Sequence, residues 1–358
     1  MSVHRIGFTE LSGSQGARDG PYRVNIIFVH GLRGHPQHTW EDSRDKANVD
    51  RDNENTGTAT LGKRNILKAL LKSRSSSSAW TLTKTPTSNK ETSDETPNKL
   101  FWPKEYLTQD IPEARVWTYG YNADAIGGLF QANNKNSVSQ HGQDLVVYLE
   151  LEIQNEDPII FVAHSLGGII VKDAIRRSDA CRARTKLVIF LGTPHRGSAS
   201  AQWGEIASNL ARLALQDSNK DIIKTLEVNS EVLEIIHEEF VAIADQSRIQ
   251  IHSFQEARGI SGMKGLHNKV VDDFSSKLGL PRSVETVQSI DANHMQMARC
   301  SDRADPRYRA IAGVLQRFIH RIVLDGNGTR LQQVSSTAPT VEATVAKKGG
   351  GFDGALTS

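Results

Sequence analysis

The chain has 358 residues, and its 43 Lys and Arg nearly balance its 41 Asp and Glu, for a formal net charge of +2. Dedicated nucleic-acid binders carry a marked basic excess, so this balance argues against that class. The chain has only two cysteines, Cys181 and Cys300, which excludes a disulfide framework and favours a reducing, intracellular compartment.

Short apolar runs that end in small or polar residues recur along the chain. Most are rich in β-branched residues, as strands of a covered parallel sheet are. In chain order the runs cover residues 24–29, 115–119, 159–163, 187–191, 249–254 and 284–290.

Apolar residues at helical spacing occupy residues 145–153, 170–175 and 311–322, before the third strand, after it and after the last one. Strands that alternate with helices predict an α/β fold, in which a mostly parallel central sheet is flanked by helices and joined by right-handed crossovers.

The remaining segments set the expected domain organisation. Residues 42–100 are polar and predict a largely disordered insertion, because such a composition buries little apolar surface. The tail, 325–358, is also expected to be disordered. One domain would then comprise 1–41 and 101–324. Within it, helical patterns at 203–246 predict a cap over the site, whose apolar residues form either its core, which we favour, or a lipid-facing surface.

No membrane-spanning or secretory segment is evident in the sequence. The N-terminal residues lack the apolar run of a signal peptide, and no window approaches the roughly 20 apolar residues of a membrane span. We therefore expect any membrane contact to be peripheral.

The candidate nucleophile is Ser165, in the sequence Ala-His-Ser-Leu-Gly at 163–167. This is a variant of G-x-S-x-G with Ala at its first position, directly after a predicted strand and before a predicted helix. The tight strand-turn-helix elbow demands small residues beside the serine, and Ala163 still meets that demand. The helix N-terminus also favours the negative charge that develops during attack.

A serine nucleophile needs a base, and two histidines compete for that role. His294 follows the last predicted strand, where the order Ser, acid, His places the base. His195 follows an earlier strand and is the weaker candidate, either structural or at the rim of the pocket. We predict His294.

The acid that orients this base is less sharply defined. Glu256 lies just past the predicted strand 249–254, at the usual acid position, and is favoured. Asp272 is the main alternative, and Asp273 could also reach the imidazole. Asp291 is near His294 in sequence but is expected to begin the loop.

Two backbone N–H groups should form an oxyanion hole. We expect them from Leu166, which follows the nucleophile, and from Leu32, which follows His30-Gly31 at the end of the first clear strand. Gly31 allows the chain to approach the substrate closely.

The residues expected to border the substrate are His30, Gly31, His164 and His195. No cluster with metal-ligand spacing, phosphate loop or dinucleotide fingerprint occurs in the sequence, so neither a metal nor a cofactor is expected.

Several segments occur together in a familiar order: 28–32, 39–40, 101–103, 119–121, 162–168, 191–197, 253–256 and 292–294. Over residues 22–322, apart from the insertion, the chain resembles the serine-active-site family of lipase-like α/β-hydrolases. That family is related to GPI inositol-deacylase and lipid-remodelling esterases, and its fungal members serve as N-terminal domains of NLR-like proteins. The resemblance implies Ser165 as nucleophile, Glu256 as acid and His294 as base. Asn293 stands where the family more often has Asp.

The sequence thus predicts a serine hydrolase that cleaves a carboxylic ester, with a lipid acyl ester favoured, through an acyl-enzyme. An acyltransferase or peptidase would use the same residues. The alternative is a signalling or recruitment module in which hydrolysis is secondary.

The expected location is cytoplasmic or, as the resemblance implies, peripheral at the endoplasmic reticulum or mitochondrial membrane. The expected partner is an ester or lipid substrate and no nucleic acid, and no oligomeric state is predicted.

Overall fold

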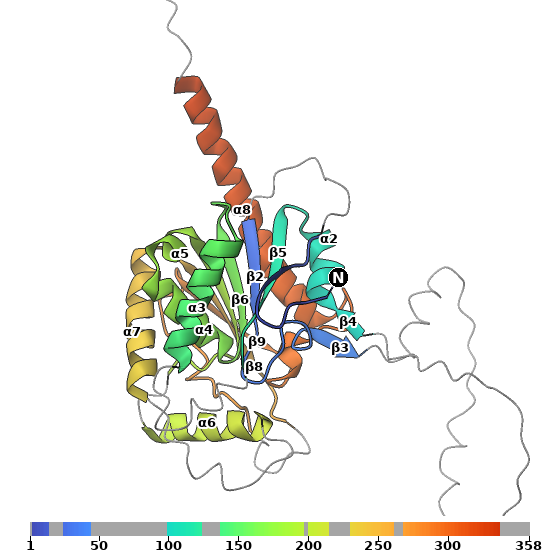
Figure 1. The fold of residues 1–358 in the computed structure, drawn as a ribbon, viewed down its shortest axis with the longest axis vertical. Coiled ribbons are helices and arrows are strands. Elements are labelled where there is room, and N and C mark those ends of the chain that lie inside the picture. Colours follow the sequence, from blue (N-terminus) through green and yellow to red (C-terminus); the bar gives the residue numbers. More distant parts are fainter. Residues whose placement is uncertain are drawn as a thin grey trace, which may run out of the picture. The chain divides into compact units, whose positions relative to one another are not determined.

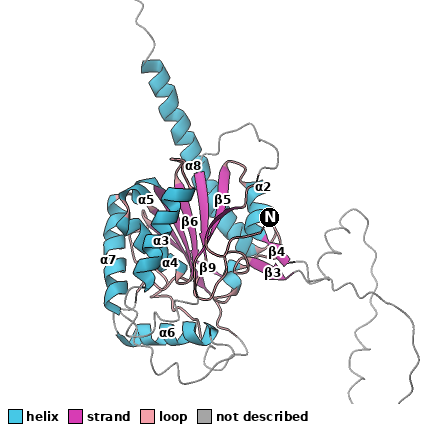
Figure 2. Ribbon diagram, viewed as in Figure 1, coloured by secondary structure: helices cyan, strands magenta, loops and turns pink. Residues whose placement is uncertain are grey.

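A seven-stranded sheet forms the centre of the computed structural model, with the order β1-β5-β2-β6-β7-β8-β9 (Figures 1 and 2). Its strands, in spatial order, are β1 (Gly7–Glu10), β5 (Ala114–Gly120), β2 (Val24–Val29), β6 (Ile159–His164), β7 (Thr185–Leu191), β8 (Gln250–Glu256) and β9 (Glu285–Ile290). All neighbours pair in parallel except β1, which is antiparallel to β5. This confirms the predicted α/β fold. β1 escaped the sequence analysis because four residues are too few to show a period.

The structure describes residues 2–13, 24–43, 99–123, 137–196, 200–214, 230–260 and 268–336. The chain divides into two units, Met1–Ala312 and Gly313–Ser358. Most of the predicted insertion and the end of the predicted tail therefore lie outside the described residues.

The helices are α2 (Thr108–Asp110), α3 (Ser137–Glu152), α4 (Gly167–Arg177), α5 (Asp179–Arg184), α6 (Ser200–Ala214), α7 (Ser230–Gln246) and α8 (Pro306–Ser336). A π-helical turn, Pro103–Leu107, leads into α2, and a 3₁₀ turn lies at Gln296–Ala298. Among the described residues, no helix is long and apolar enough to cross a membrane.

The two faces of the sheet have separate cores, because side chains alternate along each strand. Ile27 and Val29 of β2 belong to the core cluster that contains residues of α3, α4 and α7. Phe28 points to the other face, where its ring meets Trp40 at 4.9 Å and Trp102 at 5.3 Å between centroids. The strand ends that carry the candidate site are thus fixed from both faces.

The predicted cap at 203–246 is only partly correct. α7 is a flanking helix that packs on α4, and its Ile236 and Phe240 are fully buried in the core. Figure 1 shows α7 beside the sheet and α6 crossing its lower end. The prediction of a cap is therefore wrong for α7. Apolar periodicity does not distinguish a helix that packs in a cap from one that packs on the sheet.

Two predicted boundaries also need correction. Residues 42–43 and 99–100 are not disordered, because β3 (Glu41–Ser43) and β4 (Lys99–Phe101) pair antiparallel across the base of the insertion. The tail prediction is wrong for residues 325–336, since α8 continues to Ser336. Disorder was expected here from the composition, but each of the glycines at 326 and 328 costs a helix only about 1 kcal/mol.

Candidate active site

Ser165 lies on a sharp turn between β6 and α4. Its φ is 55°, in the left-handed region that non-glycine residues rarely adopt, and such strain is typical of functional sites. Its N–H donates to the Leu191 carbonyl at 2.9 Å, and its own carbonyl accepts from Gly168 at 3.1 Å. A Cβ at Gly167 would lie 2.2 Å from the His30 carbonyl oxygen, so only glycine fits there. The elbow predicted from the sequence is present.

His294 lies in the loop after β9, with its ring against the serine. Its Nε2 and the Ser165 Oγ are 3.0 Å apart, within hydrogen-bond distance. Space for the ring depends on Gly192 at the end of β7, where a Cβ would lie 3.1 Å from His294 Nδ1. Of the two histidines considered as the base, His294 is the one that contacts Ser165.

Glu256, the last residue of β8, lies on the far side of this ring. Its Oε1 is 3.3 Å from His294 Nδ1 and accepts a 2.7 Å hydrogen bond from the Val271 amide. Ser165, His294 and Glu256 are 2%, 1% and 0% exposed, so the hydrogen-bonded chain that they form is shielded from water.

The alternative acids have other partners. Asp272 accepts hydrogen bonds from the amides of Phe274 and Ser275 and from the Ser275 hydroxyl. Burial alone would raise the pKa of Asp272, but these hydrogen bonds lower it below the usual value. Asp273 pairs with Lys269 at 2.6 Å. Neither carboxylate is brought to His294.

Asp291 is likewise directed away from the base. It forms an exposed bidentate pair with Arg258. It begins the loop after β9, as expected from the sequence.

Gly31 and Leu32 follow β2 and lie beside the elbow. A Cβ at Gly31 would be 2.7 Å from the Ser165 Cβ, so this glycine allows the two turns to touch. Leu166 is the N-cap residue of α4, where the helix dipole favours negative charge. Leu32 lines the same cavity as Ser165, and Leu166 follows Ser165 directly. The oxyanion-hole role of their amides stays a prediction.

His30 supports this turn from behind and does not line the cavity at Ser165. Its ring stacks on Tyr121 at 4.2 Å between centroids, and the Tyr121 hydroxyl donates to the His30 carbonyl at 2.7 Å. Burial lowers the pKa of His30 to about 4. The predicted substrate contact is therefore not found for His30.

His195 is not at the cavity either. Its ring packs edge-on against Phe190 at 4.5 Å, and its amide donates to the Ser275 carbonyl at 2.6 Å. Burial, with nearby Lys172, holds its pKa well below the ordinary value. Of the two roles considered for His195 from the sequence, the structural role fits these contacts and the substrate-binding role does not.

His164 does line the cavity, but its side chain is engaged within the protein. Its Nε2 and the carbonyl oxygen of His294 are 2.8 Å apart, so Nε2 carries the hydrogen and donates it. Burial is the largest influence on its pKa, which falls to about 3. The ring is therefore neutral at physiological pH.

A cavity of about 270 Å³ opens over Ser165. It has an apolar wall of Leu32, Leu210, Leu213 and Met295. Its polar lining includes Arg33, His35, His38, Thr39 and Arg299. The two leucines of α6 had been considered only as part of a cap, and no local sequence signal marked Met295 or Arg299.

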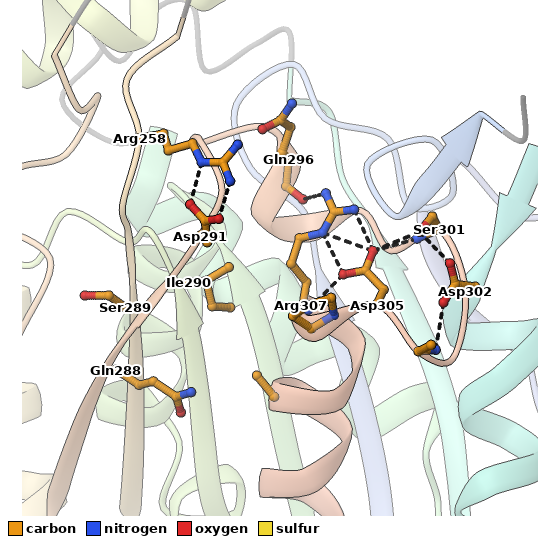
Figure 3. Close-up of a pocket in the computed structure, with 13 residues that line it drawn as sticks. Arg258, Gln288, Ser289, Ile290, Asp291, Gln296, Ser301, Asp302, Asp305 and Arg307 are labelled. Atoms are coloured by element: carbon orange, nitrogen blue, oxygen red, sulfur yellow. Dashed lines mark hydrogen bonds and ion pairs between the residues drawn. The ribbon is translucent and has the colours of Figure 1, made fainter. Parts of the chain in front are cut away.

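A larger pocket, of about 740 Å³, lies beside β9 and the start of α8 (Figure 3). Four of its charged groups form two ion pairs, Arg258 with Asp291 and Arg307 with Asp305 at 2.5 Å, and Asp302 accepts from the Ser301 hydroxyl. Ser165 and His294 do not line it. Size alone therefore does not identify the candidate site.

Within the described part of the chain, no group of three or more His, Cys, Asp or Glu side chains is arranged to hold a metal ion.

No family model matches the chain. It is similar to Protein SERAC1 of Bos taurus, at 24% identity over 288 residues, which cover 78% of this chain and 36% of that protein. Protein SERAC1 of Homo sapiens is 22% identical over 289 residues, with the same coverage of 78% and 36%. That of Danio rerio is 27% identical over 207 residues, covering 55% of this chain and 30% of the protein. The chain thus spans about a third of the length of these relatives.

Solved structures with a similar fold include a lipase-esterase related protein from Clostridium acetobutylicum ATCC 824. It is 9% identical, with 88% of this chain and 100% of that chain covered and a TM-score of 0.40. The mature form of Bacillus licheniformis lipase BlEst2 is 15% identical, with 81% and 92% covered and a TM-score of 0.44. The order of the sheet and the elbow after β6 identify the fold. The chain has an α/β-hydrolase fold, and in sequence it is similar to the SERAC1 proteins.

Proposed function

We propose that this chain is a serine hydrolase that cleaves a carboxylic ester through an acyl-enzyme. The observation that carries the proposal is the buried chain of contacts from Ser165 Oγ to His294 Nε2 and from His294 Nδ1 to Glu256. A hydroxyl, an imidazole and a carboxylate in this order are the parts that nucleophilic acyl transfer needs.

In the first half of the reaction, Ser165 Oγ attacks the ester carbonyl carbon while its proton passes to His294 Nε2. The resulting oxyanion accepts hydrogen bonds from the amides of Leu32 and Leu166. When the tetrahedral intermediate collapses, the C–O bond to the alcohol breaks and His294 returns the proton to the leaving oxygen. Glu256 holds the ring by Nδ1–H and stabilises the imidazolium.

In the second half, water attacks the acyl-enzyme and gives a proton to His294. Collapse of the second intermediate breaks the bond to Ser165 Oγ, which takes that proton back, and releases a carboxylic acid. An alcohol in place of water would make the same enzyme an acyltransferase. The products with water alone and with added alcohol distinguish these two outcomes.

The apolar wall of the cavity supports an acyl chain as the part of the substrate next to the ester. Leu210 and Leu213 from α6 and Met295 from the His294 loop would contact it. Burying each methylene contributes about 0.8 kcal/mol, so longer chains should bind more tightly until the cavity is filled. We propose a lipid acyl ester as the substrate class, and a panel of ester chain lengths tests it.

The nucleophile is tested with a fluorophosphonate probe, which reacts with activated serines. We expect the wild-type protein to be labelled and Ser165→Ala to lose both labelling and ester hydrolysis. Ser289→Ala, which changes an exposed serine on β9, is the matched control and should behave as wild type. Retained labelling of Ser165→Ala would show that the nucleophile is another residue.

The acid is tested by a pair of conservative variants. Glu256→Gln removes the carboxylate that faces His294, and we expect kcat to fall by about 10³- to 10⁴-fold. Asp272→Asn changes a carboxylate that only organises its own turn, and kcat should stay within a few-fold of wild type. The reverse pattern would assign the acid to Asp272.

The signalling or recruitment alternative stays a prediction, since no observation on the described residues favours it. Biological output that survives Ser165→Ala in the parent organism would support that alternative over the enzyme.

A further inference from the structure

His164 directly precedes Ser165, and its side chain reaches across to the loop that carries His294. Its Nε2–H donates to the main-chain carbonyl of His294 over 2.8 Å, and the two rings are 5.0 Å apart between centroids. The contact is buried and joins residues that are 130 positions apart in the chain. The carbonyl at its end belongs to the candidate base itself.

This loop has anchors on both sides of His294. Before it, the carbonyl of Ala292 accepts from the Ala257 amide at 3.1 Å. After it, the carbonyl of Ala298 accepts from Trp102 Nε1 at 2.9 Å. Between these two points, Arg307 Nη1 donates to the Gln296 carbonyl at 3.1 Å, and His164 holds the carbonyl of His294 itself, the residue whose position matters for proton transfer.

The side-chain contacts of His294 do not replace that restraint. The contact between His294 Nδ1 and Glu256 Oε1 is 3.3 Å long. The other ring nitrogen, Nε2, must break and re-form its hydrogen bond with Ser165 Oγ in each catalytic cycle. A ring held only by these contacts could shift with its backbone. Misplacement of a reacting group by about 1 Å can cost about 100-fold in rate.

His164 is itself rigidly placed. It is the last residue of β6, in register with Leu191 of β7, and a Cβ at Gly31 would lie 3.0 Å from its carbonyl oxygen. One residue thus touches the turn of the nucleophile, the turn of Gly31 and the loop of the base. Because the buried ring is neutral, it places no positive charge beside an imidazolium at His294.

We propose that His164 is a positioning residue for the reaction proposed above, which holds His294 within reach of Ser165 by donating Nε2–H to the His294 carbonyl. The inference rests on the proposed function, since it assigns His294 the role of base. It replaces the substrate contact predicted for His164 from the sequence.

The test compares His164→Gln with His164→Met. The two side chains have similar length and shape, but only glutamine offers an N–H donor. We expect His164→Met to lose about 10- to 100-fold in kcat with KM changed less than threefold. His164→Gln should regain most of this loss and stay within about fivefold of wild type. His252→Gln, at another buried histidine on β8, is the control and should keep wild-type kcat.

The outcomes separate this inference from the proposed function. Equal kcat in the two His164 variants, or a loss that appears only in KM, overturns the positioning role while labelling of Ser165 still supports the hydrolase. If wild-type protein is not labelled at Ser165, the proposed function fails and the positioning role fails with it. Thermal unfolding of each variant shows whether lost kcat reflects lost structure.

A measurement on the wild-type protein decides the case in which both variants fail to fold. ¹⁵N-histidine NMR distinguishes the two neutral tautomers and the charged ring. We expect a histidine that stays neutral with its proton on Nε2 from pH 8 to pH 5. If no histidine shows this state, the donor is absent and the proposal is overturned.

Discussion

Gly192, at the end of β7, has a φ of 57° and faces the ring of His294. An added Cβ there would lie 2.8 Å from Met297 Sδ and 3.1 Å from His294 Nδ1, and the positive φ would strain any L-residue. The position of the candidate base therefore depends on a residue that has no functional group. Its role is to leave space for the ring.

We expect Gly192→Ala to reduce kcat at least tenfold, because the ring must move away from Ser165. Strain at the positive φ should also lower the free energy of unfolding by about 1 kcal/mol. Steady-state kinetics and urea unfolding measure the two effects. Gly313→Ala, at a helical glycine with open space around it, is the control. Unchanged kcat in Gly192→Ala would show that the loop yields without loss of geometry.

Helices α6 and α7 are neighbours in the sequence but have different roles. α7 packs on α4, and its Phe240 meets Phe190 of β7 at 6.0 Å between centroids. α6 supplies Leu210 and Leu213 to the cavity over Ser165. Substitutions in α7 should therefore change stability, and substitutions on the cavity side of α6 should change selectivity.

For α7, we expect Ile236→Val to lower the free energy of unfolding by about 0.5–1.5 kcal/mol, since it removes a methyl group from a fully buried site. kcat and KM should both stay within twofold of wild type. Urea unfolding and ester kinetics on the same preparation test this. A selective change in KM would mean that α7 does act as a cap.

For α6, we expect Leu213→Ala to raise KM for long-chain esters by about tenfold and to leave short-chain esters nearly unchanged. The half-buried leucine borders the cavity, so its loss removes apolar contact only where an acyl chain reaches it. Leu151→Ala on α3, at a leucine that is 65% exposed, is the matched control. Equal effects on short and long chains would place the acyl group elsewhere.

At the scale of the whole molecule, several histidines are buried in their neutral form. Burial lowers the pKa of His30 to about 4 and those of His164 and His237 to about 3. In the unfolded chain these rings titrate near the ordinary value of 6.5. Below that pH the unfolded state binds more protons than the folded state, so acid favours unfolding.

We therefore expect stability to fall as the pH drops from 6.5 towards 4. At pH 5, one fully buried histidine such as His30 contributes a loss of up to ~2 kcal/mol. Urea unfolding at several pH values measures the slope, and His164→Gln should make it shallower. The lowered pKa values of Asp272 and Asp305 act in a separate window below about pH 4. A flat profile between pH 7 and 5 would contradict the buried neutral state.

Local sequence patterns predict most of the sheet and the order of the chemical groups along the chain. The runs at 24–29 and 159–163 predicted β2 and β6 because buried strands are marked by continuous apolar residues. Ser165, Glu256 and His294 could be chosen because each lies at or shortly after the end of a predicted strand, and the carboxyl ends of parallel strands meet at one edge. Position relative to a strand end is a local property that a sequence displays.

The surroundings of those groups could be read only from the folded chain. His164 ends β6 and His195 follows β7, as His294 follows β9, yet His164 contacts the His294 carbonyl and His195 packs on Phe190. α6 and α7 share an apolar period but pack on different neighbours. A periodic pattern shows which face of an element is buried. The partner of that face is fixed by residues far away in the chain, and so the lining of the cavity could not be predicted from local signals.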